Sequence, residues 1–74
     1  MVNRIVFDSK ILGGKPIIKG TRISVEFVLE LICSGMSVEE ISEEYSQLKK
    51  EDILAAAGYA AKALKHEEVL LIGQ

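Results

Sequence analysis

The sequence predicts a mainly α-helical fold, with three helices that follow a short N-terminal β arm. Before Ser24 the apolar residues form short β-branched runs broken by glycine, whereas after it they recur at the helical period. Ser24 and Ser37 stand directly before the first two helical runs, where serine caps a helix well. These observations place the β arm in residues 1–23, the helices in residues 24–67 and an apolar tail in residues 68–74.

The length and composition indicate one small domain over residues 1–74. The chain is 49% hydrophobic and 27% charged, which is ordinary for a globular protein. A chain of this size buries only about 60% of its unfolded surface, so a monomer has little margin of stability. The single cysteine cannot form an intramolecular disulfide, and the single histidine cannot build a zinc site. We therefore expect a homodimer or a complex with a partner.

The arm contains two strand candidates, Arg4–Phe7 and Ile17–Ile18, on either side of a turn at Gly13 and Gly14. Strands this short are unstable alone. They must therefore pair with each other or with the same strands of a second chain. For pairing between chains, the predicted dimer interface consists of Ile5, Phe7, Ile17 and Ile18.

The first two helices have clear boundaries in the sequence. Ser24 caps the first helix, and Gly35 ends it. Ser37 and Glu40 have the spacing of a capping box at the start of the second helix, which should end near Tyr45.

The third helix is predicted from about Lys50 to about Glu67, although Lys49 is a poor cap for it. Gly58 lies inside this helix, where glycine costs about 1 kcal/mol relative to alanine, so we expect a close packing contact there, within the chain or across a dimer. A short second helix, a connection of about four residues and a longer third helix have the order of a homeodomain-like helix-turn-helix unit.

Charge is distributed unevenly along the chain. Residues 1–25 carry five basic side chains against one acidic one, whereas residues 26–74 carry four basic side chains against ten acidic ones. This asymmetry favours one anion-binding surface on an acidic body, with a solvated basic loop as the alternative.

No group of side chains is arranged for catalysis. The acidic run of the second helix is interpreted as a solvated face, because a metal site would need further ligands. We interpret His66 as a surface residue and Cys33 as a small buried or interface thiol. The stretch before Thr21 lacks the spacing of a phosphate-binding P-loop. We expect a protein that is not an enzyme and that holds no metal or cofactor.

The sequence also gives no sign of a membrane protein. No run approaches the ~18 apolar residues of a membrane span, and the first ten residues lack the apolar core of a signal peptide. Together with a lone cysteine, this favours a cytoplasmic location.

The segment from Gly13 to Ile23 carries the strongest functional signal, with three glycines, the only proline and three basic residues. Glycines let the backbone approach another surface closely, and basic and hydroxyl side chains bind phosphates. The candidate phosphate ligands are Lys15, Lys19, Thr21 and Arg22. In the alternative interpretation the glycines and the proline only shape a hairpin, and Arg22 pairs with an acid such as Glu26.

Three runs of the sequence, GGKPIIKGTRISV, SGMSVEEISEEY and EDILAAAGYAA, resemble the "domain of unknown function 433" family over about residues 3–64. Members of that family are similar to VapB-type antitoxins, often encoded beside a PIN-like toxin nuclease. The resemblance implies a homeodomain-like three-helix unit with a β arm. The chain departs from the family pattern at Ser46, where a proline is expected, and at Lys49, where a threonine-like cap is expected.

The resemblance implies a dimeric antitoxin that binds its own promoter as double-stranded DNA and neutralises a toxin nuclease. The third helix would offer Lys49 and Lys50 to DNA, but Glu51 and Asp52 follow directly and repel phosphates, so the arm should carry most of the binding. The apolar tail would either pack on the core or bind the partner through Val69, Leu70, Leu71 and Ile72. The alternatives are a protein-interaction or dimerisation module, or a stand-alone transcriptional regulator, without a toxin partner.

Overall fold

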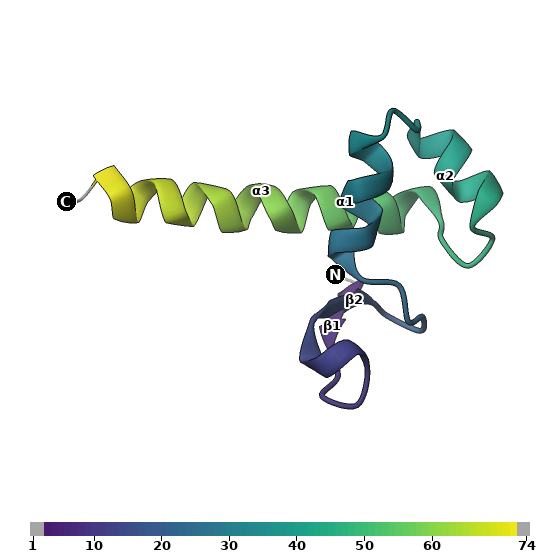
Figure 1. The fold of residues 1–74 in the computed structure, drawn as a ribbon, viewed down its shortest axis with the longest axis horizontal. Coiled ribbons are helices and arrows are strands. Elements are labelled where there is room, and N and C mark those ends of the chain that lie inside the picture. Colours follow the sequence, from purple (N-terminus) through teal and green to yellow (C-terminus); the bar gives the residue numbers. More distant parts are fainter. Residues whose placement is uncertain (1–2, 73–74) are drawn as a thin grey trace.

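A two-stranded hairpin and three helices make up the fold in a computed structural model that describes residues 3–72, with side chains described for residues 3–65. Figure 1 shows the hairpin on one side of α1 and the pair α1 and α2 packed against the first half of α3. The elements are β1 (Ile5–Phe7), a 3-10 turn (Leu12–Gly14), β2 (Pro16–Ile18), α1 (Val25–Cys33), α2 (Val38–Glu44) and α3 (Lys50–Ile72). The predicted mainly helical fold with a short β arm is confirmed.

The two strands pair with each other, in antiparallel register, with Val6 opposite Ile17. The connection turns through the left-handed region, at φ 51° for Leu12 and φ 67° for Gly13, which glycine adopts without strain and leucine does not. A single bridge between Ile17 and Ser24 then leads the chain from the hairpin into α1. Of the two predicted arrangements, the structure therefore has pairing within the chain.

The helix boundaries follow the capping signals. The Ser24 hydroxyl accepts a hydrogen bond from the Phe27 amide at 2.9 Å, and Gly35 ends α1 with φ 101°. At the start of α2 the Glu40 amide donates to the Ser37 hydroxyl, and the Ser37 amide donates to the Glu40 carboxylate. The Ser37 amide, and after it the Ser37 hydroxyl, lower the pKa of Glu40, because hydrogen bonds from both groups to the carboxylate favour its ionised form.

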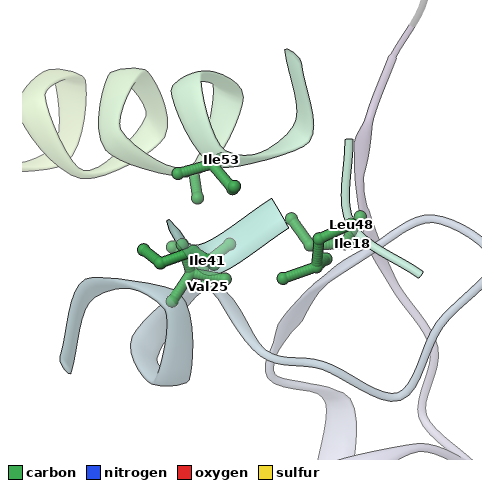
Figure 2. Packing of buried hydrophobic residues seen from close by; sticks show 7 residues of the cluster. Ile18, Val25, Ile41, Leu48 and Ile53 are labelled. Atoms are coloured by element: carbon green, nitrogen blue, oxygen red, sulfur yellow. The ribbon is translucent and has the colours of Figure 1, made fainter. Parts of the chain in front are cut away.

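The hydrophobic core lies where the hairpin, α1, α2 and α3 meet. Figure 2 shows Val25 and Ile41 facing Ile53, and Leu48 beside Ile18. Leu48 comes from the connection between α2 and α3, so this loop is anchored to the hairpin by apolar packing. The buried cluster consists of Ile18, Val25, Val28, Ile41, Leu48, Ile53 and Ala56. The β arm is thus an integral part of the core.

An ion pair joins the hairpin to α3. The Arg4 guanidinium donates to an Asp52 carboxylate oxygen at 2.8 Å, across 48 positions of sequence. The second carboxylate oxygen of Asp52 accepts from the Lys49 amide at 2.9 Å. Asp52, the third residue of α3, therefore makes the half of a capping box in which a side chain returns to the amide of the residue before the helix. This carboxylate is only 7% exposed as a residue, which makes both partners necessary.

The third helix is longer than predicted. It continues to Ile72, five residues beyond the predicted end, so the backbone of the predicted 68–74 tail is mostly helix. Figure 1 shows its second half projecting straight away from α1 and α2. The side chains of Val69, Leu70, Leu71 and Ile72 lie outside the described residues. In the part of the chain that the structure describes, every helix is too short or too polar to cross a membrane.

We expect Asp52→Ala to lower the free energy of unfolding by about 2–3 kcal/mol, because it uncaps α3 and leaves Arg4 without its partner. Asp52→Asn should cost less, since an amide oxygen can still accept from the Lys49 amide. Urea unfolding followed by circular dichroism measures both effects. Glu43→Ala, at an exposed position of α2, is the control and should stay within about 0.5 kcal/mol of wild type. Equal losses for all three variants would contradict this account of α3.

Candidate nucleic-acid interface

A tight turn from Ile18 to Ile23 presents Arg22 to solvent. Gly20 adopts φ 83°, and the Ile18 amide donates to the Ile23 carbonyl at 2.9 Å. The Thr21 hydroxyl donates to the Ile18 carbonyl at 2.8 Å and accepts from the Ile23 amide at 2.9 Å. The predicted role of Thr21 as a phosphate donor needs correction, because its only proton is used inside the turn. Thr21 instead holds the backbone that carries the exposed Arg22 side chain.

This turn is linked to the start of α3 by a chain of hydrogen bonds. The Lys19 amide donates to the Arg4 carbonyl at 2.8 Å, Arg4 pairs with Asp52, and Asp52 accepts from the Lys49 amide. The backbones of Lys19 and Lys49, which are thirty positions apart in sequence, are thereby both held by the ion pair between Arg4 and Asp52. Their side chains are both exposed. The sequence could not predict this grouping, because it depends on a contact between the hairpin and α3.

A cleft of about 750 Å³ opens beside the turn. Its lining combines apolar side chains with the polar side chains of Asp8, Arg22 and Gln47. Gln47 belongs to the connection between α2 and α3, so the cleft brings Arg22 next to the residues that precede Lys49. Neither Gln47 nor Asp8 is marked by any motif in the sequence. The complete lining is Val6, Asp8, Ile11, Ile17, Gly20, Thr21, Arg22, Ile23 and Gln47.

The other two predicted basic ligands, Lys15 and Lys50, form ion pairs with acidic side chains of α1 and α2. The Lys15 ammonium is 3.1 Å from a Glu26 carboxylate oxygen, and Lys50 is 3.9 Å from Glu39 of α2. Glu26 is therefore paired with Lys15 rather than with Arg22. The side chains of all four ion-paired residues are more than half exposed, so each of these pairs contributes little to stability and dissociates readily. Lys19 and Lys49 are connected through Arg4 and Asp52, and Arg22 lies in the turn that follows Lys19; we call these three residues the basic cluster.

The four predicted dimer residues differ in how far they are exposed to solvent. Ile17 and Ile18 are 2% and 1% exposed within their own chain, so they offer no surface to a second one in this conformation. Ile5 is partly buried against the core. Phe7 is different, because it is 61% exposed and lies with its ring centroid 6.2 Å from that of Tyr59 in α3.

The chemistry of the cleft suits binding better than proton transfer. Asp8 is its only carboxylate, and one oxygen of that group accepts from the Lys10 amide at 2.9 Å. Cys33 is exposed on the last turn of α1, on neither side of the cleft. Among the described side chains, residues 3–65, there is no cluster of three His, Cys, Asp or Glu that could hold a metal ion. A guanidinium among apolar lining residues instead matches an anionic or planar ligand group.

We expect Thr21→Val to destabilise the turn by about 1–2 kcal/mol, since it leaves the Ile23 amide and the Ile18 carbonyl without their hydroxyl partner. Thr21→Ser keeps the hydroxyl and is the matched control, with an expected loss below that of Thr21→Val. Thermal unfolding gives the stability, and amide hydrogen exchange at Ile23 reports on the turn itself. Unchanged exchange at Ile23 in Thr21→Val would show that the hydroxyl does not hold the turn.

Comparison with known proteins places this architecture in a family. The model of a protein family described as "Protein of unknown function (DUF433)" matches residues 5–60. The crystal structure of a DUF433 member protein from Anabaena variabilis ATCC 29413 superposes with a TM-score of 0.78 at 28% identity, covering 97% of this chain and 70% of that one.

A curated relative, the uncharacterized protein y4eO of Sinorhizobium fredii (strain NBRC 101917 / NGR234), is 42% identical over 50 residues. The match covers 68% of this chain but only 23% of that protein, so the chain spans less than a quarter of its relative's length. The resemblance seen in the glycine-rich segment and in the two helical runs thus extends across the hairpin, α1, α2 and the first half of α3. The chain belongs to the DUF433 family.

Proposed function

We propose that this protein is a small DNA-binding antitoxin that acts as a homodimer, represses its own promoter and neutralises a PIN-like toxin nuclease. The observation that carries the DNA-binding part is the hydrogen-bonded chain from Lys19 through Arg4 and Asp52 to Lys49. It fixes the basic turn beside the first turn of α3. Preorganised cations bind phosphates with less loss of entropy than mobile ones.

In this proposal α2, the connection 45–49 and α3 act as a homeodomain-like helix-turn-helix unit. Asp52, whose position shortly after Lys49 and Lys50 argued against DNA binding, is neutralised by Arg4 and nearly buried. Its repulsion of phosphates is therefore largely cancelled, whereas Glu51 remains exposed and unfavourable. With three phosphate contacts from each of the two protomers, the logarithm of the affinity should fall with a slope of about −5.4 against the logarithm of salt concentration.

The antitoxin part rests on the resemblance to VapB-type antitoxins and on the length of α3. A helix that projects beyond the body is suited to lie in a groove on a partner, with apolar residues as anchors. The sequence of its last turns supplies such residues in Val69, Leu70, Leu71 and Ile72. Neutralisation would then follow from blocking the metal site or the substrate path of the nuclease.

Binding to the DNA upstream of its own gene tests the DNA-binding part. We expect Arg22→Glu to lower the affinity by a factor of about ten or more, because it replaces a phosphate contact by a repulsion. Lys15→Glu is the matched control, since Lys15 is an exposed base of the same segment that lies outside the basic cluster. Fluorescence anisotropy at several salt concentrations measures both. Equal affinities of Arg22→Glu and wild type would rule out binding through the cluster.

Capture of partners from the lysate of its own cells separates an antitoxin from a module that works without a toxin. We expect the full chain to retain a small nuclease at near-equal stoichiometry, identified by mass spectrometry. Removal of residues 69–74 should abolish this capture and leave the melting temperature nearly unchanged. A large fall in melting temperature would instead assign the segment to packing within the protein. Capture of no partner, with DNA binding intact, would favour the stand-alone regulator.

A further inference from the structure

The side of α3 that faces away from the core is apolar and exposed. Ile53 and Ala56 are fully buried on the inner side, whereas Leu54 is 61% exposed and Gly58 and Ala61 are exposed on the outer side. The spacing of three and four positions places Leu54, Gly58 and Ala61 along one line of the helix. We call this line the outer stripe.

A groove of about 490 Å³ between β1 and α3 widens this apolar surface. The exposed ring of Phe7 forms one wall of the groove, and Gly58 lies on the opposite wall. The lining consists of Asn3, Arg4, Ile5, Phe7, Ala55, Gly58, Tyr59 and Lys62. The outer stripe and the groove meet at Gly58, so together they form one continuous surface along the side of α3.

Gly58 has no role that its own chain explains. Its backbone is ordinary helix, and a β-carbon built there would meet no atom within 4 Å. Among the described side chains, residues 3–65, none therefore makes the close packing contact that the sequence predicts at Gly58. What glycine provides at an exposed helical position is a closer approach of a second helix, since no side chain separates the two backbones.

The charged residues at the two ends of the outer stripe indicate which second helix would approach Gly58. Glu51 lies seven residues before Gly58 and Lys65 lies seven residues after it, and all three are exposed. Fourteen residues make about four turns, so Glu51 and Lys65 lie on the same side of α3, about 21 Å apart along its axis. A second α3 that crosses at Gly58 in the antiparallel direction brings each Glu51 to the Lys65 of the other copy. A parallel copy would instead place like charges together.

We propose that α3 binds the α3 of a second copy of this chain, antiparallel, with the two Gly58 residues at the crossing point. In this arrangement Leu54 of each copy packs against Ala61 and the aliphatic stem of Lys62 of the other. The exposed Phe7 flanks the crossing. This inference rests on the homodimer of the proposed function and gives it a specific surface, in place of the buried Ile17 and Ile18.

A charge-swap cycle tests the arrangement, with the full chain alone and no DNA or partner present. Sedimentation equilibrium gives the dimer dissociation constant at low salt. We expect Glu51→Lys and Lys65→Glu each to weaken the dimer by about tenfold, because each creates two repulsive pairs. The double variant should return to within about threefold of wild type. Failure of the double variant to recover, or a wild-type chain that is monomeric up to about 1 mM, would overturn the proposal.

Gly58 provides a second, steric test. Gly58→Gln places a long side chain at the crossing and should abolish the dimer, while Gly58→Ala adds one methyl group and should largely preserve it. Both variants have better helix formers than glycine, so circular dichroism should show unchanged or higher helix content. A Gly58→Gln chain that dimerises as wild type would overturn the proposal. Because Gly58 lies outside the basic cluster, loss of the dimer in this variant is distinguishable from loss of the phosphate contacts measured with Arg22→Glu.

Discussion

The ion pair between Arg4 and Asp52 is the interaction on which the rest of the structure depends. A carboxylate as buried as Asp52 needs hydrogen-bond donors for both of its oxygens, and it finds one in the hairpin and one at the start of α3. The pair therefore closes the fold between its two most distant segments. It also fixes where the basic turn lies relative to α3, so stability and the candidate interface share one set of contacts.

The parts of the fold that the sequence predicts well are those determined within four residues. The caps at Ser24 and Ser37 and the stop at Gly35 are local patterns, and all three are confirmed. The end of α3 was placed too early, because the apolar run at 69–72 carries no residue that stops a helix. The pairing of Arg4 with Asp52 is beyond any local pattern, since 48 residues separate its two members.

The sequence predicts which segment and which kinds of side chain form the candidate interface, but not which individual residues belong to it. The density of glycines and basic residues identified the segment that contains Lys19 and Arg22. Which of the basic residues act together depends on tertiary contacts: Lys15 turns to Glu26 on α1, whereas Lys49 joins through Asp52. Thr21 shows the same limit, because a hydroxyl that could serve a ligand is indistinguishable in sequence from one that closes a turn.

The helix α3 runs without interruption from Lys50 to Ile72, so a change in the direction of its first turn moves its far end. Its 23 residues span about 35 Å at a rise of about 1.5 Å per residue, and Asp52 holds its amino end. Since the helix has no internal proline or break, a tilt of about 10° in its first turn carries the last turn through about 6 Å. A movement of the far end therefore acts on the part of α3 that packs against α1 and α2 and that contains Asp52, the partner of Arg4 and of the Lys49 amide. The two ends of α3 are thereby connected mechanically by one continuous helix.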